Sequence, residues 1–301
     1  MTNGAALEGR IIAAHGRHYT VELADGSLRK CFPRGKKAGA AVGDFVVIAP
    51  QGAEEGAIER ILERRNLLYR SDDMRTKQFA ANVDQLLIVV AVEPAFSDDL
   101  TGRALVAAWS AGIEPLIILN KADLSERLAD ARRRLSGLSK LGIRVIELSA
   151  LDSKHVQTLL LPELKNRTSL LLGQSGMGKS TILNTLVPSA LAHTQEYSVA
   201  LGAGKHTTTS TRLYHLPDNG GDLIDSPGFQ AFGLYHLSAS EIEQGFPEFT
   251  AAIQHCRFYN CTHRHEPGCG VLAALERGDI TRERHELYQR ILAENEAKSR
   301  Y

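Results

Sequence analysis

The sequence lacks the features that would place it in a membrane or mark it for secretion. None of its apolar runs approaches the roughly 18–20 residues of a membrane-spanning helix. Its N-terminus has neither the basic start nor the apolar centre of a signal peptide. The formal net charge is zero, so no overall basic field attracts nucleic acid, and any such surface must be local. We expect a cytoplasmic protein without membrane contact, and we expect a monomer.

Disorder is disfavoured as well, because 43% of the residues are hydrophobic and only 23% are charged. With 301 residues, the chain is long enough for two or three domains. Cysteine is scarce: of the four cysteines, three lie between positions 256 and 269, and Cys31 stands apart. This crowding does not suit a disulfide framework, and in a reducing compartment it points to a metal site.

The cysteine-rich stretch has the spacing of a zinc site. It reads C-x4-C-x-H-x5-C, which supplies three thiolates and one imidazole, the ligand set of a closed structural zinc centre. His265 is a rival for the imidazole position, and His255 is a weaker one. Segments 237–249 and 279–297, on either side, look helical. The four expected zinc ligands are Cys256, Cys261, His263 and Cys269.

A phosphate-binding loop is the strongest motif in the chain. Residues 173–180 read G-x-x-x-x-G-K-S, between the apolar run 169–172 and a helical pattern at 180–186. Glycines allow successive backbone N–H groups to face phosphate oxygens, and the positive end of the helix reinforces them. Lys179 would bring a positive charge to the β- and γ-phosphates, and the Ser180 hydroxyl would bind Mg²⁺. The expected nucleotide-binding residues of this loop are Gly173, Gln174, Ser175, Gly176, Met177, Gly178, Lys179, Ser180 and Thr181.

The region around this loop alternates between buried strands and helices. Apolar runs at 86–92, 115–119 and 145–148 predict parallel strands, and helical patterns follow at 100–111 and 124–141. This alternation predicts an open α/β sheet, in which ligand-binding loops follow the carboxyl ends of the strands.

Two of those loops carry residues suited to a guanine base. Residues 120–123 follow a core strand and resemble the N-K-x-D motif of GTPases. Guanine presents two donors side by side, N1–H and N2–H₂, and the carboxylate of Asp123 can accept both. A site built in this way rejects analogues that lack the donors. Residues 149–150 stand in the place of a supporting S-A motif, whose backbone would contact the guanine edge. The residues expected at the base are Asn120, Lys121, Asp123, Ser149 and Ala150.

Two further segments complete a triphosphate site with magnesium. Residues 225–228 match D-x-P-G, in which Asp225 would hold Mg²⁺ and the Gly228 N–H would meet the γ-phosphate. The glycine-flanked polar segment 201–209 is interpreted as the first switch, with Thr208 completing the Mg²⁺ shell when the γ-phosphate is present. The expected magnesium ligands are Ser180, Thr208 and Asp225.

The order of these motifs is unusual. Ordinary GTPases run from the phosphate loop through the switch threonine and D-x-x-G to N-K-x-D and S-A. Here N-K-x-D and S-A come first, at 120 and 149, and the phosphate loop, the switch and D-x-P-G follow. The cyclic order is unchanged, so the same sheet can form with its chain ends relocated. The D-x-P-G segment then leads directly into the cysteine-rich region.

The stretch from about residue 8 to 63 reads as short strands broken by turns, which predicts a small closed β-barrel of the OB type. Asp25-Gly26, between two of these strands, is a strong hairpin signal. The locally basic run 29–37 is either an RNA-contacting strand and loop or an ordinary solvated loop. Residues 64–80 show a weaker pattern and are expected to be a linker. The strand candidates are 9–14, 19–23, 27–32 and 44–48.

Together these motifs closely resemble one family, the circularly permuted, ribosome small-subunit-dependent GTPase A of bacteria. The resemblance covers nearly the whole chain, from the barrel through the permuted motifs to the cysteine cluster. It implies an OB-type, RNA-binding barrel at residues 1–64, a permuted GTPase domain at 65–233 and a helical zinc-binding domain at 234–301. It also implies binding of GTP and GDP, GTP hydrolysis stimulated by the small ribosomal subunit, contact with its rRNA, and a role in late maturation of that subunit.

One departure from Ras-type proteins bears on the mechanism. Phe229 directly follows D-x-P-G, where Ras-type proteins carry the glutamine that orients the attacking water. Phenylalanine cannot orient water, so we hypothesise that His206, in the first switch, positions or deprotonates it. The expected catalytic residues are His206, Lys179 and Thr208. Two other functions stay open: a GTP-dependent RNA-binding switch with incidental hydrolysis, and an ATPase, against which the N-K-x-D motif argues.

Overall fold

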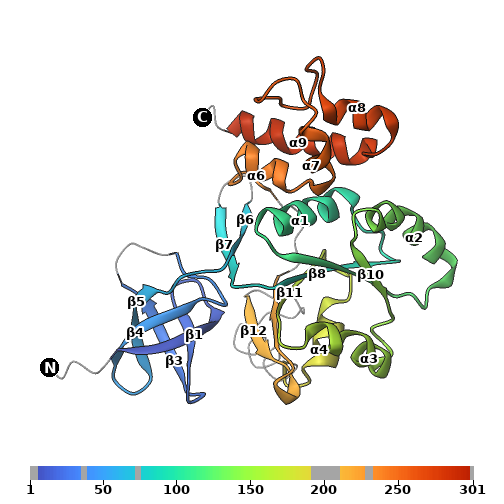
Figure 1. The fold of residues 1–301 in the computed structure, drawn as a ribbon. Helices are drawn as coiled ribbons and strands as arrows, with labels where there is room; N and C mark the ends of the chain where they lie inside the picture. Colours follow the sequence, from blue (N-terminus) through green and yellow to red (C-terminus); the bar gives the residue numbers. More distant parts are fainter. Residues whose placement is uncertain (1–5, 35–38, 72–75, 191–210, 228–232, 299–301) are drawn as a thin grey trace.

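The three parts of the chain occupy separate regions of the computed structural model, which describes residues 6–34, 39–71, 76–190, 211–227 and 233–298. A β-barrel lies beside a central sheet flanked by helices, and a helical module sits on top of the central part (Figure 1). This arrangement confirms the expected fold class of barrel, α/β sheet and small helical module. In the described part of the chain, no helix is both long and apolar enough to cross a membrane.

The N-terminal barrel closes through its first and fourth strands. Its order is β1-β2-β3-β5-β4, with β4 pairing back onto β1, and β3 runs parallel to β5. Five short strands closed in this way form the OB-type barrel that the sequence predicts. Gly26 occupies the expected hairpin turn at φ 80°, a conformation that glycine adopts without strain. The strands are β1 (Leu7–Ala14), β2 (Tyr19–Leu23), β3 (Leu28–Pro33), β4 (Phe45–Gln51) and β5 (Glu55–Ile61).

The stretch expected to be a linker instead contains two paired strands. β6 (Leu67–Ser71) and β7 (Thr76–Ala81) pair as an antiparallel two-stranded sheet. Just before β6, Arg64 donates to both carboxylate oxygens of the fully buried Asp44 in the barrel, at 2.7 Å each. The prediction of a linker at 64–80 was wrong, because two paired strands lie in this stretch and Arg64 bonds to the barrel.

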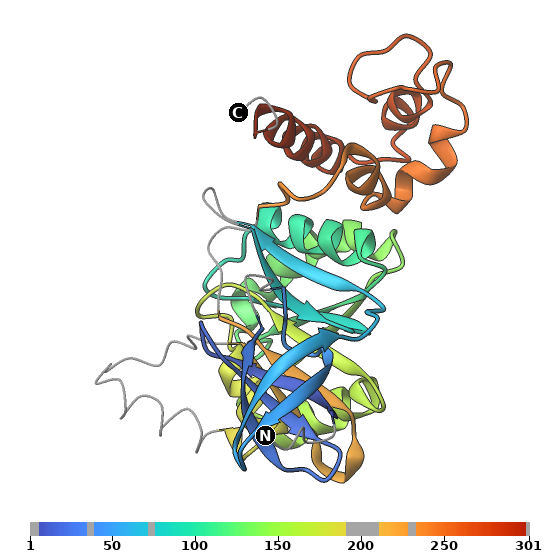
Figure 2. The same ribbon diagram turned by 90° about the vertical axis from the view of Figure 1, so that its left-hand side faces the viewer.

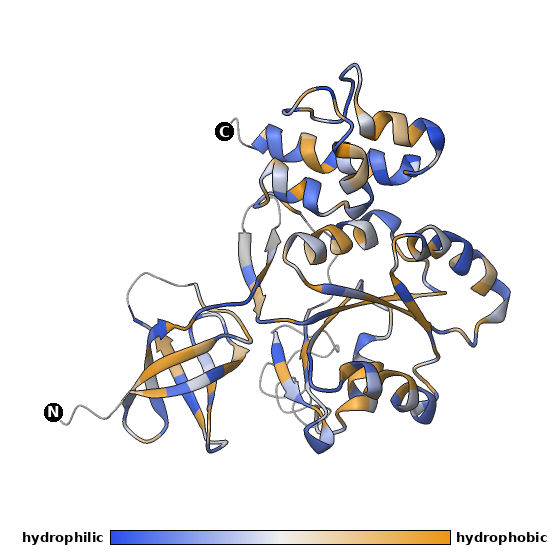
Figure 3. Ribbon diagram, in the orientation of Figure 1, coloured by the Kyte–Doolittle hydropathy of each residue, from blue (hydrophilic) through white to orange (hydrophobic). Residues whose placement is uncertain are grey.

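The central sheet alternates strands and helices, as the sequence predicts. Its order is β10-β9-β8-β11-β13-β12; neighbouring strands are parallel except β12, which pairs antiparallel with β13. The apolar strands lie between helices on both faces (Figure 3), and every residue of β8 and β11 is buried. Helix α3 and strand β12 were not predicted.

The bounds of these elements follow the chain. The strands are β8 (Gln85–Ala91), β9 (Glu114–Asn120), β10 (Arg144–Glu147), β11 (Thr168–Leu172), β12 (Arg212–His215) and β13 (Asp222–Asp225). The helices are α1 (Asp98–Ser110), α2 (Ser125–Ser139), α3 (Ser153–Leu164), α4 (Lys179–Leu186) and the short η1 (Pro217–Asn219).

The C-terminal module packs on helix α1 of the central part (Figure 2). A Cβ on Gly102 would lie 2.4 Å from Leu287 Cδ2, so a larger residue would force these helices apart. Arg103, whose side chain is 9% exposed, donates to both carboxylate oxygens of Glu294 at 2.7 and 2.8 Å. Helix α8 was not predicted. The elements are α6 (Ala239–Gln244), η2 (Pro247–Phe249), α7 (Thr250–Ile253), α8 (Gly270–Arg277) and α9 (Arg282–Lys298).

Candidate functional site

The phosphate loop, between β11 and α4, folds around the side chain of Lys179. The Lys179 ammonium donates to the carbonyl oxygens of Gly173 and Gln174, at 2.7 and 2.9 Å. Gly178 has φ 94°, which favours glycine, and a Cβ at this position would lie 2.1 Å from Asn120 Nδ2. The glycines of the motif therefore serve both the turn of the loop and its close contact with a neighbouring loop.

One buried amide ties the base-recognition loops to the phosphate loop. Asn120 Nδ2 donates to Met177 O at 2.8 Å, and Asn120 Oδ1 accepts from the backbone N–H groups of Lys121 and Ala150 at 2.8 and 2.9 Å. Asn120 is 1% exposed. The N-K-x-D, S-A and phosphate loops, which are distant in the sequence, meet at this residue.

The residues predicted to contact the base lie beside this junction. Lys121 has φ 60°, and its Nζ donates to Glu93 O at 2.6 Å. Ser149 Oγ accepts from the N–H of Leu151 at 3.4 Å. Asp123 is exposed, so its carboxylate is accessible to the two neighbouring donors of a guanine.

The D-x-P-G segment begins at the carboxyl end of β13, close to the phosphate loop. Burial lowers the pKa of Lys179, and the nearby carboxylate of Asp225, itself 3% exposed, acts in the opposite direction. Ser226 Oγ donates to Leu171 O at 2.7 Å and so fixes this segment to β11. Ser180 is exposed in the first turn of α4. A hydroxyl and a carboxylate near the lysine are oxygen ligands of the kind Mg²⁺ prefers, so these residues fit the ion.

Some predicted site residues lie outside the described residues. They are His206 and Thr208 of the first switch and Gly228 of D-x-P-G. The other predicted nucleotide-site residues lie on the phosphate loop, on the two base loops and at the end of β13.

The sequence did not reveal a contact that braces the phosphate loop from outside. The N–H of Ser97, the N-cap residue of α1, donates to Gln174 Oε1 at 2.8 Å. The partners are 77 residues apart, so no local pattern indicates the pair. Through this bond, the helix that carries the C-terminal module also touches the phosphate loop.

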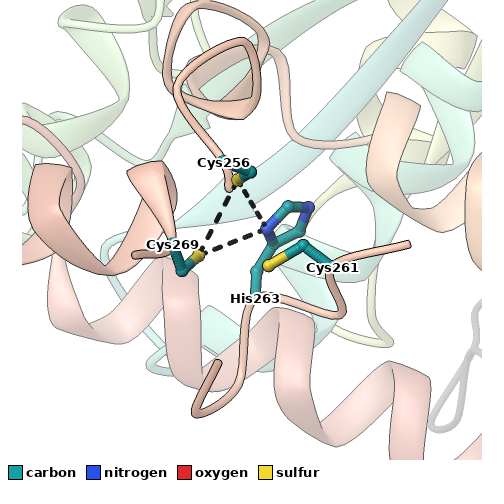
Figure 4. Close-up of side chains that lie close together, drawn as sticks. All are labelled: Cys256, Cys261, His263 and Cys269. Atoms are coloured by element: carbon teal, nitrogen blue, oxygen red, sulfur yellow. Dashed lines mark hydrogen bonds between the residues drawn. The ribbon is translucent and has the colours of Figure 1, made fainter. Parts of the chain in front are cut away.

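The predicted zinc ligands lie together in the C-terminal module (Figure 4), where their four ligand atoms are within 4.8 Å of one another. Cys256 Sγ is 4.0 Å from Cys269 Sγ, and His263 Nδ1 is 3.6 and 3.4 Å from these two sulfurs. Tetrahedral Zn–S bonds of about 2.3 Å place sulfurs roughly 3.8 Å apart, so this spacing fits zinc. Cys261 completes the cluster, whereas the rival His265 is exposed and lies outside it.

Neighbouring groups orient the cluster's side chains. His263 Nε2 lies 2.9 Å from Glu243 Oε2 on α6, which leaves Nδ1 facing the thiols. The N–H of Gly270 donates to Cys256 Sγ at 3.3 Å, which fixes the position of this sulfur. Glu243 was not predicted, because it stands 20 residues before His263 in a separate helix.

Comparison with known proteins identifies close relatives of the whole chain. The sequence model of the RsgA GTPase family matches residues 61–235. The chain is 72% identical, over 98% of both lengths, to a protein of Bordetella pertussis named small ribosomal subunit biogenesis GTPase RsgA. It is 54% identical to the protein of that name from Ralstonia nicotianae, with 96% of this chain and 92% of the relative covered.

Two solved structures share the fold over nearly the full length. YjeQ from Thermotoga maritima superimposes with a TM-score of 0.71 at 31% identity, covering 96% of this chain and 98% of that one. YloQ, described as a circularly permuted GTPase, gives a TM-score of 0.70 at 27% identity, covering 99% of this chain and 97% of that one. The permuted motif order read from the sequence agrees with this likeness.

Proposed function

The chain belongs to the RsgA GTPase family and is a GTP-hydrolysing enzyme, and from this premise we propose that it acts on the small ribosomal subunit. In this proposal the chain binds the subunit, hydrolyses GTP to GDP and phosphate when the subunit stimulates it, and assists late maturation of the subunit. The name of the Bordetella pertussis relative, at 72% identity, supports the choice of partner. We place the protein in the cytoplasm as a monomer.

The observation that carries the proposal is the junction at Asn120. Its side chain bonds to Met177 in the phosphate loop and to Ala150 in the S-A loop. A nucleotide whose phosphates lie on the phosphate loop would therefore place its base near the S-A loop. This geometry supports a guanine nucleotide over adenine, because Asp123, in the adjoining N-K-x-D motif, offers acceptors and no donor.

The proposed roles of the site residues follow from the motifs to which they belong. Mg²⁺ held by Ser180, Thr208 and Asp225 would neutralise charge that develops on the phosphates. Lys179 would bind the β- and γ-phosphates, and the Gly228 N–H would hold the γ-phosphate. We assign the positioning of the attacking water to His206, because an imidazole can accept a proton near neutral pH and Phe229 cannot.

The two flanking parts are proposed to contact rRNA. In the barrel (residues 1–64), Lys30 Nζ lies over the ring of Phe32 at 5.2 Å, on a strand that also carries Arg29. A cation beside a partly exposed aromatic ring is suited to unpaired bases. The GTPase part (65–233) would be the switch, and the part at 234–301 would be a platform stabilised by structural zinc.

The test measures GTP turnover by the purified chain alone, with small ribosomal subunits and with large subunits, for the wild type and for His206→Ala. We expect stimulation by the small subunit only. The His206→Ala variant should lose about 10²–10⁴-fold of the stimulated rate while its affinity for GDP stays unchanged, because the imidazole acts on water and not on the nucleotide.

Other outcomes would redirect the assignment. Tight, nucleotide-dependent binding of the subunit without faster turnover would favour the RNA-binding switch with incidental hydrolysis. Equal competition by ATP for the GTP site would contradict guanine recognition by Asn120, Lys121 and Asp123. Parallel loss of nucleotide affinity and turnover in His206→Ala would remove the catalytic role from that residue.

A further inference from the structure

Strand β12 connects the barrel to the predicted magnesium ligand. On one edge of β12, Arg212 stands opposite Asp225 of β13, and on the other edge it stands opposite Ala13 of barrel strand β1. Among the described residues, the ladder between the barrel and β12 is short: it consists of this one residue pair and a bond from Ala14 N to Thr211 O at 3.4 Å. Because the backbone contacts between the barrel and β12 are so few, side chains contribute much of the contact at this junction.

A cluster of charged side chains supplies that control at the other end of β12. His215, the last residue of β12, lies 2.7 Å from Asp222 Oδ1 through Nδ1 and 2.7 Å from Glu22 Oε2 through Nε2. The Arg10 guanidinium pairs with the second Asp222 oxygen and donates to Thr168 Oγ1 at 2.9 Å. Glu22 and Arg10 belong to the barrel, whereas the other three belong to the central sheet, so the cluster spans the junction.

The charges of this cluster complement one another. The hydrogen bond to Asp222, with further support from Glu22, raises the pKa of His215 to about 9 against the effect of burial. Burial acts to raise the pKa of Asp222, but His215 and Arg10 lower it overall. Two cations therefore alternate with two carboxylates, and the side chains of Arg10 and Asp222 are only 15% and 18% exposed.

We propose that Arg10 and Glu22 are positioning residues that couple the orientation of the barrel to the state of the nucleotide site through the β12–β13 ladder. Arg10 and Glu22 contact the β12–β13 ladder at the pair formed by His215 and Asp222. Asp225 lies at the opposite end of this ladder, where it pairs with Arg212. A shift of Asp225 on binding GTP rather than GDP would then be transmitted to the barrel, and by linkage the barrel would bias the nucleotide site equally. The inference rests on the proposed role of Asp225 as a Mg²⁺ ligand.

A second attachment makes the idea testable without unfolding the chain. The barrel is also held by the bond from Ala81 N of β7 to Val42 O at 2.9 Å, so breaking the charged cluster should leave it folded and attached. Glu22→Gln keeps the shape of the side chain and removes its charge. Glu59→Gln is the matched control, because Glu59 pairs with Arg34 within the barrel and makes the same charge change away from the junction.

The experiment compares hydrogen exchange of barrel strands β1 and β2 in the full chain bound to GDP and to a non-hydrolysable GTP analogue. The wild type and Glu59→Gln should show a difference in exchange between the two nucleotides, and in Glu22→Gln and Arg10→Gln most of this difference should be lost. A purely stabilising cluster would instead raise exchange equally in both nucleotide states.

Two results would overturn the coupling: a wild-type barrel that exchanges identically with both nucleotides, or cluster variants that keep the full difference. No ribosome is present in the measurement. A failure of small-subunit stimulation would therefore count against the proposed function and not against this junction. Glu22→Asp, which restores the charge, should recover part of the nucleotide difference.

Discussion

The nucleotide site and the zinc cluster are held together by opposite means. At the nucleotide site, the chain satisfies its own polar groups: Lys179 bonds to two loop carbonyls, and Asn120 uses both ends of its amide. In the zinc cluster, four ligand atoms converge within 4.8 Å, and three of them are thiol sulfurs that a metal would satisfy. The first site is shaped by the fold, whereas in our proposal the second is completed by a metal.

The surroundings of the two sites explain the contrast. The phosphate loop follows β11, every residue of which is buried in the large central sheet. The zinc ligands lie in the irregular stretch between α7, which has 4 residues, and α8, which has 8. Small units with little regular structure commonly need a metal for stability. We therefore expect the zinc cluster to be disrupted by removal of the metal, and the nucleotide site by loss of its internal hydrogen bonds.

Removal of zinc should have the largest effect. Structural zinc contributes on the order of 10 kcal/mol of binding free energy, and that energy is coupled to folding. Chelation, or Cys261→Ser, should expose the amides of α8 and α9 to hydrogen exchange. GDP affinity should change by no more than about twofold, because distant sites act nearly independently. The measurements are hydrogen exchange and a GDP titration on the same sample.

Cys31→Ala provides the control for metal content. It removes the remaining thiol, which is fully buried in the barrel, and should leave one zinc per chain by elemental analysis. Protection of α8 and α9 that survives chelation would show that the module folds without metal and would erase the contrast. A collapse of GDP affinity on chelation would contradict the independence of the two sites.

The next largest effect is expected from Asn120→Ala. The substitution leaves Met177 O and Ala150 N buried without their partner, at a cost of about 1–3 kcal/mol for each group. We expect the free energy of unfolding, measured in denaturant without nucleotide, to fall by about 2–5 kcal/mol. Guanine nucleotide affinity should fall as well.

Asp123→Ala should separate the recognition of guanine from the stability of the fold. Asp123 is exposed, so its loss should weaken guanine binding while changing the free energy of unfolding by less than about 0.5 kcal/mol. If the Asn120 and Asp123 variants have the same free energy of unfolding, the hydrogen bonds of Asn120 are not what shapes the nucleotide site.

The sequence predicted the parts of these sites whose chemistry is local. The phosphate loop, N-K-x-D and the cysteine spacing are short patterns, and their placement after core strands or in one cluster follows from the pattern itself. The contacts that position them were not predictable, because their partners are distant: Ser97 and Gln174 are 77 residues apart, and Arg10 and Asp222 are 212 apart. The bond between Arg64 and Asp44 was not predicted for the same reason: the two residues are 20 positions apart, and in the sequence Arg64 reads as a surface charge.

Glu243→Gln is expected to have the smallest effect. It tests whether a single carboxylate orients a ligand of the zinc cluster. Glu243 Oε2 lies 2.9 Å from His263 Nε2, and a carboxylate there orients the imidazole and increases its basicity as a ligand. Glutamine keeps an acceptor but loses the charge, so zinc should be bound about 10–100-fold more weakly with the module still folded at saturating metal. Competition with a chelator measures this change. Glu276→Gln, an exposed change of the same charge on α8, should leave zinc affinity intact. If both variants release zinc alike, the fold of the module and not this carboxylate orients the ligand, which would make the zinc cluster resemble the nucleotide site after all.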